Sequence, residues 1–291
     1  MRSKLFVPGS RPELFSKALG SQADAISIDL EDSVVAERKS EARAFVALFL
    51  KSNEVLASNK TLIVRVNGLD TPYFPGDVEA VAQARLAMLN LPKVESADDI
   101  LAAVAVLERT EATAGIDTPI RLLANVESPK GLRFANEIAA AHPRVAGLQL
   151  GFIDLFEPLG IDRYDKATLH AVMLTVRMAA GASGVFAYDG AFPDVQDVDG
   201  FRAEAAMARR LGFLGKSCIH PRQVDLANDV FMSQEWDLAY ALRVLSASEE
   251  AKARGAGAFL LDGRMIDAPG VRRAQAVLAV SKGAPPGDKQ R

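Results

Sequence analysis

Three carboxylates stand within four positions of one short stretch, AISIDLEDSV. Asp29, Glu31 and Asp32 directly follow an apolar run. Like charges this close together repel one another, so a metal ion, an arginine or bulk water must compensate them. A metal ion or an arginine would indicate an active site, whereas water alone would indicate a solvated turn.

An arginine follows in the next apolar run, TLIVRVN, which contains Arg65. Side chains alternate between the two faces of a strand, so Asp29 and Glu31 share a side, and Arg65 lies on the polar side of the following strand. A buried arginine usually pairs with a carboxylate, for which Glu31 is a candidate. The pattern favours Arg65 as the compensating group, with Asp32 turned toward the loop.

Two further carboxylates, Glu127 and Asp154, come after two successive runs, IRLLANV and VAGLQLG. A pair of carboxylates with room for water suits a hard divalent cation such as Mg²⁺, which keeps positions open for substrate oxygens. An ion pair or a helix N-cap is the commoner explanation of such residues. The spacing therefore permits a metal site without requiring one.

The elements that must position these residues are eight short apolar runs with the composition of buried strands. They occupy residues 4–7, 25–30, 61–67, 85–91, 120–126, 145–151, 184–188 and 213–219. Segments with helical spacing separate them, and eight such units over about 230 residues predict an α/β fold, the (β/α)₈ barrel, with functional groups at the carboxyl ends of the strands. An open doubly wound sheet alternates in the same way and stays possible.

The sequence also predicts two regions of different character. The barrel is expected to occupy residues 1–233. Residues 234–291 contain two further helix-like segments around the stretch GAFLLDGRMID, which is more than a barrel needs. We expect a C-terminal helical extension that packs on a neighbouring subunit.

Composition limits the partners and the compartment. The 291 residues are 49% hydrophobic with a formal net charge of −3, and basic residues cluster no further than pairs. This favours a small-molecule partner over nucleic acid. The longest apolar region is interrupted by Arg177 and glycines, so no membrane span is expected. A single cysteine, Cys218, and the lack of a secretory signal predict a cytoplasmic protein with an inert core thiol.

Taken together, the motifs resemble those of the citrate lyase β-subunit family within the HpcH/HpaI aldolase superfamily. The resemblance covers nearly the whole chain in order, through RSKLFVPGSRPELFSKA, ADAISIDLEDSV, LIVRVNG, LPKVES, ANVESPKGL, GFIDLFEPLG, GFLGKSCIHPRQV and GRMIDAPGVRRA. It implies a (β/α)₈ barrel, Mg²⁺, and cleavage or formation of a carbon–carbon bond beside an acyl thioester, usually of coenzyme A. Homotrimers or hexamers are usual in the family.

The resemblance also assigns roles to particular residues. Glu127 of NVESPKG and Asp154 of GFIDL resemble the two metal ligands. Arg65 of VRVNG resembles the arginine that binds the substrate carboxylate and the developing oxyanion. Asp267 of RMIDAP resembles a late aspartate that a neighbouring subunit contributes as acid/base.

The N-terminal motif implies a coenzyme A site. Phe6, Arg11 and Lys17 match the spacing of the residues that hold the nucleotide end of coenzyme A in related malyl-CoA lyases. Two positions depart from the family pattern. Ile153 stands where many relatives have a second acid, and Pro158 stands where a small or acidic residue is common, which affects substrate choice around that loop.

With Glu127 and Asp154 as ligands, the acids of the opening stretch take an indirect catalytic role. Glu31 and Asp32 are expected to orient Arg65 and the water that a bound metal carries. Direct coordination of the ion by either residue would contradict this division.

The implied reaction is a Mg²⁺-dependent retro-aldol or Claisen-type cleavage of a 3-hydroxyacyl thioester that carries a carboxylate, such as malyl-, citramalyl- or citryl-CoA. Its products would be an acyl-CoA and a 2-oxo acid. Two alternatives stay open: a metal-dependent acyl-CoA thioesterase on the same barrel, and a non-catalytic thioester-binding subunit of a larger lyase complex. The carrier, coenzyme A or an acyl-carrier protein, is also open.

Overall fold

The computed structural model describes residues 1–232 and 235–281. The chain divides into two compact units, the first from Met1 to Phe231 and the second beginning at Met232. In the first unit every strand overlaps one of the eight predicted runs. These strands are β1 (Ser3–Pro8), β2 (Ala25–Asp29), β3 (Thr61–Arg65), β4 (Met88–Leu91), β5 (Arg121–Val126), β6 (Val145–Leu150), β7 (Phe186–Tyr188) and β8 (Lys216–Cys218).

The eight strands are parallel and follow the order β7-β6-β5-β4-β3-β2-β1-β8. β8 pairs with β1, with Lys4 opposite Ser217. At the other end of this order, Asp189 follows β7 directly and forms a parallel bridge to Lys216 of β8. The sheet therefore closes on itself, which excludes the open doubly wound alternative and confirms the predicted (β/α)₈ fold.

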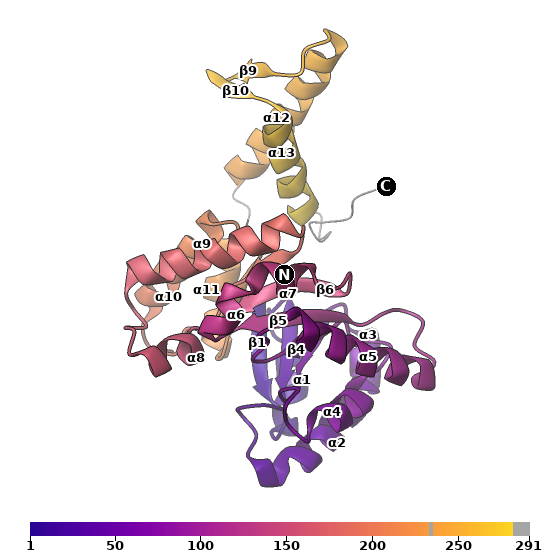
Figure 1. Cartoon of the computed structure of the whole chain (residues 1–291). Helices are drawn as coiled ribbons and strands as arrows, with labels where there is room; N and C mark the ends of the chain where they lie inside the picture. Colours follow the sequence, from indigo (N-terminus) through magenta and orange to yellow (C-terminus); the bar gives the residue numbers. More distant parts are fainter. Residues whose placement is uncertain (233–234, 282–291) are drawn as a thin grey trace. The chain divides into compact units, whose positions relative to one another are not determined.

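Helices surround the strands in the first unit (Figure 1). Along this ring α2 packs on α4, α4 on α5, α5 on α7, and α7 on α9. The helices are α1 (Phe15–Leu19), α2 (Lys39–Leu50), α3 (Asn53–Ala57), α4 (Phe74–Val81), α5 (Ala97–Ala114), α6 (Pro129–Arg133), α7 (Ala135–Ala140), α8 (Phe152–Phe156), α9 (Lys166–Ala182), α10 (Val198–Arg210) and α11 (Pro221–Phe231).

The local sequence accounts for the ends of the longest of these helices. Ser96 caps α5, because its hydroxyl accepts a hydrogen bond from the Asp99 N–H at 3.2 Å while the Asp99 carboxylate accepts one from the Ser96 N–H. Gly115 ends the helix in the left-handed conformation, at a φ of 66°. A serine followed three residues later by an acid, and a glycine after the last helical residue, are the sequence signals typical of these two helix ends.

The barrel interior changes character along its axis. Toward the amino ends of the strands, the interior is filled by a small apolar cluster of Ala25, Ile63, Met88, Leu123 and Ala146. The larger core lies between strands and helices. Toward the carboxyl ends, the inward positions become polar, which places the charged residues of the predicted site at the mouth of the barrel.

A buried charge network lies beside the closure of the barrel. Lys216 Nζ is 2.7 Å from Asp189 Oδ2 and 2.7 Å from Glu204 Oε1. Arg163 donates to both oxygens of Glu204, at 2.8 and 2.9 Å. We call Arg163, Asp189, Glu204 and Lys216 the seam network, because it joins β8, the loop after β7, α10 and the segment before α9.

The second unit consists of α12 (Glu235–Ala253), β9 (Phe259–Leu261), β10 (Arg264–Ile266) and α13 (Ala268–Ser281). β9 and β10 form an antiparallel hairpin. α12 and α13 pack on each other around a small core that includes Ala241, Val244, Ile266 and Ala274. No helix in residues 1–232 or 235–281 is both long and apolar enough to cross a lipid bilayer.

Candidate active site

Arg65 is the centre of the charged cluster at the mouth of the barrel. It lies in register with Asp29 on the neighbouring strand. Its Nε and Nη2 donate to the two oxygens of Asp29 at 2.7 and 2.8 Å. Its Nη1 lies 3.0 Å from Glu31 Oε2 and donates to Asp32 Oδ2 at 3.2 Å. The predicted pairing of Arg65 with Glu31 is confirmed, and Asp29 is the more fully bonded partner.

Burial makes these interactions stronger than they would be on an open surface. Burial by itself would raise the pKa of Asp29, but the charge and hydrogen bonds of Arg65 hold that pKa below its usual value. Burial would likewise lower the pKa of Arg65, and the Asp29 carboxylate raises it instead. Both groups therefore stay charged, and the guanidinium is fixed in one orientation.

Lys93 links this cluster to Glu127, which follows β5. It follows β4 with a φ of 52°, a left-handed conformation that non-glycine residues seldom adopt. This backbone directs the Lys93 N–H to Glu127 Oε1 at 2.6 Å. The side chain turns the other way, and its Nζ lies 2.7 Å from Glu31 Oε1. One residue thus contacts an acid from β2 and another from β5.

Glu127 follows β5 and is only 3% exposed. Besides the Lys93 N–H, it accepts a hydrogen bond at Oε2 from Asn125 Nδ2, at 3.1 Å. Asp154 lies in the first turn of α8, which begins directly after Gly151 at the end of β6, and its side chain is exposed. The two carboxylates predicted as metal ligands thus follow adjacent strands.

The charge of the buried Glu127 carboxylate is incompletely compensated by its neighbours. Burial raises the pKa of Glu127 to about 7, despite the Lys93 N–H and the charge of Arg65, and the nearby charges of Asp154 and Glu31 add to the rise. A divalent cation would supply the missing positive charge.

Oxygen donors of this type fit Mg²⁺, which is commonly held by one or two carboxylates and completes its shell with water and substrate oxygens. Within the described ranges, no group of three or more His, Cys, Asp or Glu side chains could hold a metal ion. Glu127 and Asp154 are two carboxylates that follow adjacent strands, which matches the number and type of protein ligands that Mg²⁺ takes.

Phe6 and Lys4, both on β1, lie under the Arg65 cluster. The Phe6 ring stands between two cations, with its centroid 4.3 Å from Lys4 Nζ and 5.2 Å from Arg65 Cζ. Lys4 is fully buried, and its Nζ donates to Gln149 Oε1. Burial lowers the pKa of Lys4 well below its usual value, and the charge of Arg65 lowers it further.

Two other predicted site residues of the first unit, Arg11 and Lys17, lie outside this cluster. Arg11 is exposed and pairs with Glu13, and Lys17 is exposed on α1. Asp267 belongs to the second unit, where it precedes α13 and accepts a hydrogen bond from the Gly270 N–H at 3.4 Å. The structure brings together Phe6, Arg65, Glu31, Asp32, Glu127 and Asp154.

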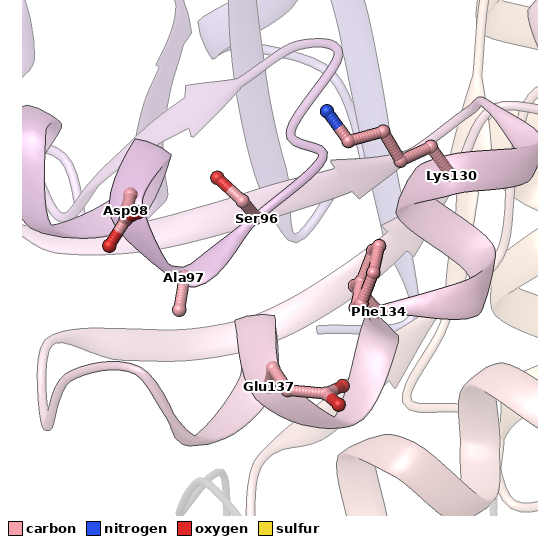
Figure 2. A pocket seen from close by; sticks show the side chains of 6 residues that line it. All are labelled: Ser96, Ala97, Asp98, Lys130, Phe134 and Glu137. Carbon is pink, nitrogen blue, oxygen red and sulfur yellow. The ribbon is translucent and has the colours of Figure 1, made fainter.

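A hollow of about 340 Å³ lies away from these residues, at the start of α5 (Figure 2). Two of its polar groups have partners of their own: Ser96 caps α5, and Lys130 Nζ lies 3.2 Å from Glu95 Oε2. None of the predicted site residues lines it. Its lining residues are Ser96, Ala97, Asp98, Lys130, Phe134 and Glu137.

Sequence reasoning missed several residues that the structure places around the site. Asn90 donates to Asn125 in the barrel interior, and Lys4 pairs with Gln149 there. Alternation could have found Lys4, because it lies two residues from Phe6 and so shares its side of the strand. No sequence signal predicts the left-handed backbone of Lys93.

Comparison with known proteins gives relatives along nearly the full chain. The sequence is 37% identical over 298 residues to the L-malyl-CoA/beta-methylmalyl-CoA lyase of Rhodobacter capsulatus, covering 95% of this chain and 93% of that protein. It is also 37% identical over 283 residues to the citrate lyase subunit beta of Haemophilus influenzae, covering 97% of each chain.

Solved structures show the same architecture. The protein CitE from Mycobacterium tuberculosis, in complex with magnesium, acetoacetate and coenzyme A, superposes with a TM-score of 0.76 at 32% identity, over 97% of this chain and 100% of that one. A citrate lyase from Burkholderia xenovorans LB400 reaches a TM-score of 0.83 over 98% of this chain and 93% of that one, and at 23% identity this likeness bears on the fold alone.

The family comparison agrees with these relatives. Residues 2–221, which span the barrel from β1 to the start of α11, match the family described as HpcH/HpaI aldolase/citrate lyase. The chain belongs to the HpcH/HpaI aldolase/citrate lyase family.

Proposed function

We propose that this lyase uses Mg²⁺ to cleave a 3-hydroxyacyl thioester that carries a carboxylate beside its hydroxyl, such as malyl-, citramalyl- or citryl-CoA. The products would be an acyl-CoA and a 2-oxo acid. The observation that carries the proposal is a buried carboxylate, Glu127, whose pKa is raised to about 7, at the same barrel mouth as the fixed guanidinium of Arg65. Relatives named malyl-CoA lyase and citrate lyase subunit beta support the reaction class.

Glu127 and Asp154 would hold the ion, and the magnesium complex of a solved relative supports its identity. Bound there, Mg²⁺ would act as a Lewis acid toward the carboxylate and hydroxyl oxygens of the substrate. Arg65 would place a positive charge beside the oxygen on which negative charge develops. Asp29 takes the Nε N–H and one Nη2 N–H, so Nη1 would serve this purpose once the exposed Asp32 gives way to a substrate oxygen.

Glu31 and Asp32 would act through Arg65, since both lie within 3.2 Å of its Nη1. Lys93 would help to keep Glu31 in place through their 2.7 Å ion pair. This arrangement holds the guanidinium ready before the substrate arrives, so that little reorganisation is needed during the reaction.

The coenzyme A part of the substrate would be bound by Phe6, Arg11 and Lys17. Arg11 and Lys17 are exposed near the end of β1, where a cation can reach phosphate groups without being desolvated. The coenzyme A bound in the solved relative from Mycobacterium tuberculosis supports this class of carrier.

Asp267 would be the acid that protonates the thioester enolate, supplied by the second unit of a neighbouring subunit in a trimer or hexamer. Mixing inactive Asp267→Ala and Arg65→Ala proteins should restore part of the activity, because some sites would then combine an intact Arg65 with an intact Asp267. Lack of recovery after verified subunit exchange would refute this assignment.

The deciding experiment is mass spectrometry of the products from malyl-, citramalyl-, methylmalyl- and citryl-CoA, with and without Mg²⁺. We expect an acyl-CoA and a 2-oxo acid from at least one substrate, only with the metal, and no product from Glu127→Ala or Asp154→Ala. Free coenzyme A without bond cleavage would instead identify a thioesterase. Binding of ligand and Mg²⁺ without turnover would identify a non-catalytic subunit.

A further inference from the structure

The orientation of Glu127 depends on the buried side-chain amides of Asn125 and Asn90. The proposed reaction gives neither residue a role. Asn125 lies two residues before Glu127 on β5, so both side chains point to the barrel interior. It is 1% exposed, and its Nδ2 donates to Glu127 Oε2 at 3.1 Å. The other oxygen, Oε1, accepts the Lys93 N–H at 2.6 Å. A donor on each oxygen prevents the carboxylate from rotating.

Asn90 determines which end of the Asn125 amide faces Glu127. It lies on β4, is fully buried, and uses Nδ2 to donate both to the Leu123 carbonyl at 2.9 Å and to Asn125 Oδ1 at 2.6 Å. The Asn125 oxygen therefore faces Asn90, and its NH₂ group faces Glu127. A reversed Asn125 would set two NH₂ groups against each other and an amide oxygen against the carboxylate.

An asparagine at position 90 destabilises the fold more than an apolar side chain would. Its Oδ1 is among the buried side-chain atoms that have no hydrogen-bond partner in the described structure. Leaving a buried acceptor unpaired costs about 1–3 kcal/mol, which an apolar side chain would avoid. What Asn90 contributes is its NH₂ donor, which holds the Asn125 amide in one orientation.

We propose that Asn90 and Asn125 are positioning residues that set the affinity of Glu127 for a divalent cation. The inference rests on the proposed function, because it takes Glu127 as a ligand of the ion. Each Glu127 oxygen receives one N–H from the protein and keeps its remaining lone-pair capacity for the cation. Groups that orient a ligand in this way typically change metal affinity by about 10–100-fold when they are removed.

The test is the dissociation constant of Mn²⁺, a spectroscopic substitute for Mg²⁺, measured by electron paramagnetic resonance on the full-length, metal-free protein. Asn125→Leu should weaken Mn²⁺ binding about 10–100-fold. Asn90→Leu should weaken it less, and the double variant should resemble Asn125→Leu alone, because Asn90 acts through Asn125. At saturating Mg²⁺, kcat should return to within about tenfold of the wild-type value.

Gln149 provides a matched control. It is a buried carboxamide in register with Asn125 on the next strand, but it pairs with Lys4 and, among the described residues, forms no hydrogen bond with Glu127. Gln149→Met should change the thermal stability without changing the Mn²⁺ dissociation constant beyond about twofold. If it weakens binding as much as Asn125→Leu does, the effect belongs to the whole polar interior and the proposal is wrong.

The outcomes separate this inference from the proposed function. If the wild-type protein binds Mn²⁺, Glu127→Ala abolishes binding and Asn125→Leu leaves it unchanged, only the positioning role fails. If Glu127→Ala also leaves binding unchanged, the metal assignment itself fails. If Asn125→Leu does not fold, Asn90→Leu serves for the same test. Its substitution lies one hydrogen bond further from the Glu127 carboxylate.

Discussion

Arg65 has five N–H groups, and the geometry leaves few of them for a substrate. Asp29 takes the two donors on one edge of the guanidinium in a bidentate pair. Nη1 faces Glu31 and Asp32, of which Asp32 is half exposed. Because Asp32 is the outermost and most solvated of these acids, a substrate carboxylate can replace it at least cost. We therefore expect Asp32, rather than Asp29, to move when substrate binds.

At the residue scale, the protonation of Glu127 predicts how cation binding depends on pH. The pKa of this carboxyl is raised to about 7, and a cation binds only the ionised form. Mg²⁺ affinity should therefore be level above pH about 7 and fall about tenfold for each unit below it. Titration calorimetry of the metal-free protein at a series of pH values checks this, and a constant affinity from pH about 5 to about 7 would contradict it.

Strand alternation identified the partners at the mouth but not their hydrogen bonds. It placed Asp29 and Glu31 on one side and pointed to Arg65 as their counterion, because a strand has a fixed two-residue repeat. Alternation puts Asn125 on the same side of its strand as Glu127, but an isolated amide in an apolar run does not reveal its hydrogen-bond partner, so the link from Asn90 to Asn125 was not predicted. Nothing in the sequence around Lys93 indicates a positive φ, so the hydrogen bond from its N–H to Glu127 was not predictable.

At the scale of elements, the β6–α8 junction brings Asp154 to the site. Alternation no longer applies after β6 ends, so the sequence alone did not predict the direction of Asp154. α8 begins immediately after Gly151, and its first turn carries Asp154. Gly151 is also packed against Glu127, since a Cβ added there would lie 2.6 Å from Glu127 Cβ and closer still to Oε2.

Gly151→Ala should therefore displace the Glu127 side chain and weaken cation binding about tenfold or more, with a loss of stability of about 1–3 kcal/mol from overpacking. Calorimetric Mg²⁺ titration and thermal unfolding measure the two effects. Gly257→Ala is the matched control, because a Cβ there meets nothing within 4 Å. Equal cation affinity in the two variants would show that Gly151 does not control the position of Glu127.

The predicted strands were right in number and place because each apolar run is bounded by segments of different periodicity. Their ends were less well predicted. β7 and β8 have three residues each, shorter than the runs that contain them, since only part of each run pairs with a neighbour in the barrel. The alternation of strands and helices along the sequence could not distinguish a barrel from an open sheet. Closure of the barrel depends on contacts between the first and last strands of the sheet order.

At the scale of the whole molecule, the seam network stands where ladder pairing is sparsest, at the single bridge between β7 and β8. Glu204 is the partner of both Lys216 and Arg163. Burial would raise the pKa of Glu204, but these two cations hold it below its usual value. Loss of the Glu204 charge would therefore weaken the network, because Lys216 would keep only Asp189 as a charged partner among the described residues.

Glu204→Gln should destabilise the first unit by about 3–5 kcal/mol, because it leaves two buried cations with less compensating charge. Asp229→Asn is the control, since the pair of Arg202 and Asp229 is exposed and should contribute no more than about 1 kcal/mol. Thermal or urea unfolding of both variants gives the comparison. A Glu204→Gln protein as stable as the control variant would mean that closure does not depend on the network.

The division of the chain after Phe231 lies close to the boundary expected between residues 233 and 234. The expectation rested on the completion of eight strand–helix units by that point in the sequence. That the second unit packs on a neighbouring subunit stays a prediction, and the subunit-mixing experiment addresses it. The sequence does not reveal which surface the second unit packs on, because the periodicity of a helix shows only that it has an apolar face.

The pairing of β1 with both β2 and β8 has a consequence for biosynthesis. The Ser3 hydroxyl donates to Asn228 across 225 positions of sequence, and β8 is the last strand of the barrel to leave the ribosome. During translation β1 therefore keeps one unpaired edge until nearly the whole barrel has been made, and such edges are sites of aggregation. The nascent chain is most in need of chaperone protection in this interval, which ends only when residues 216–218 can reach β1.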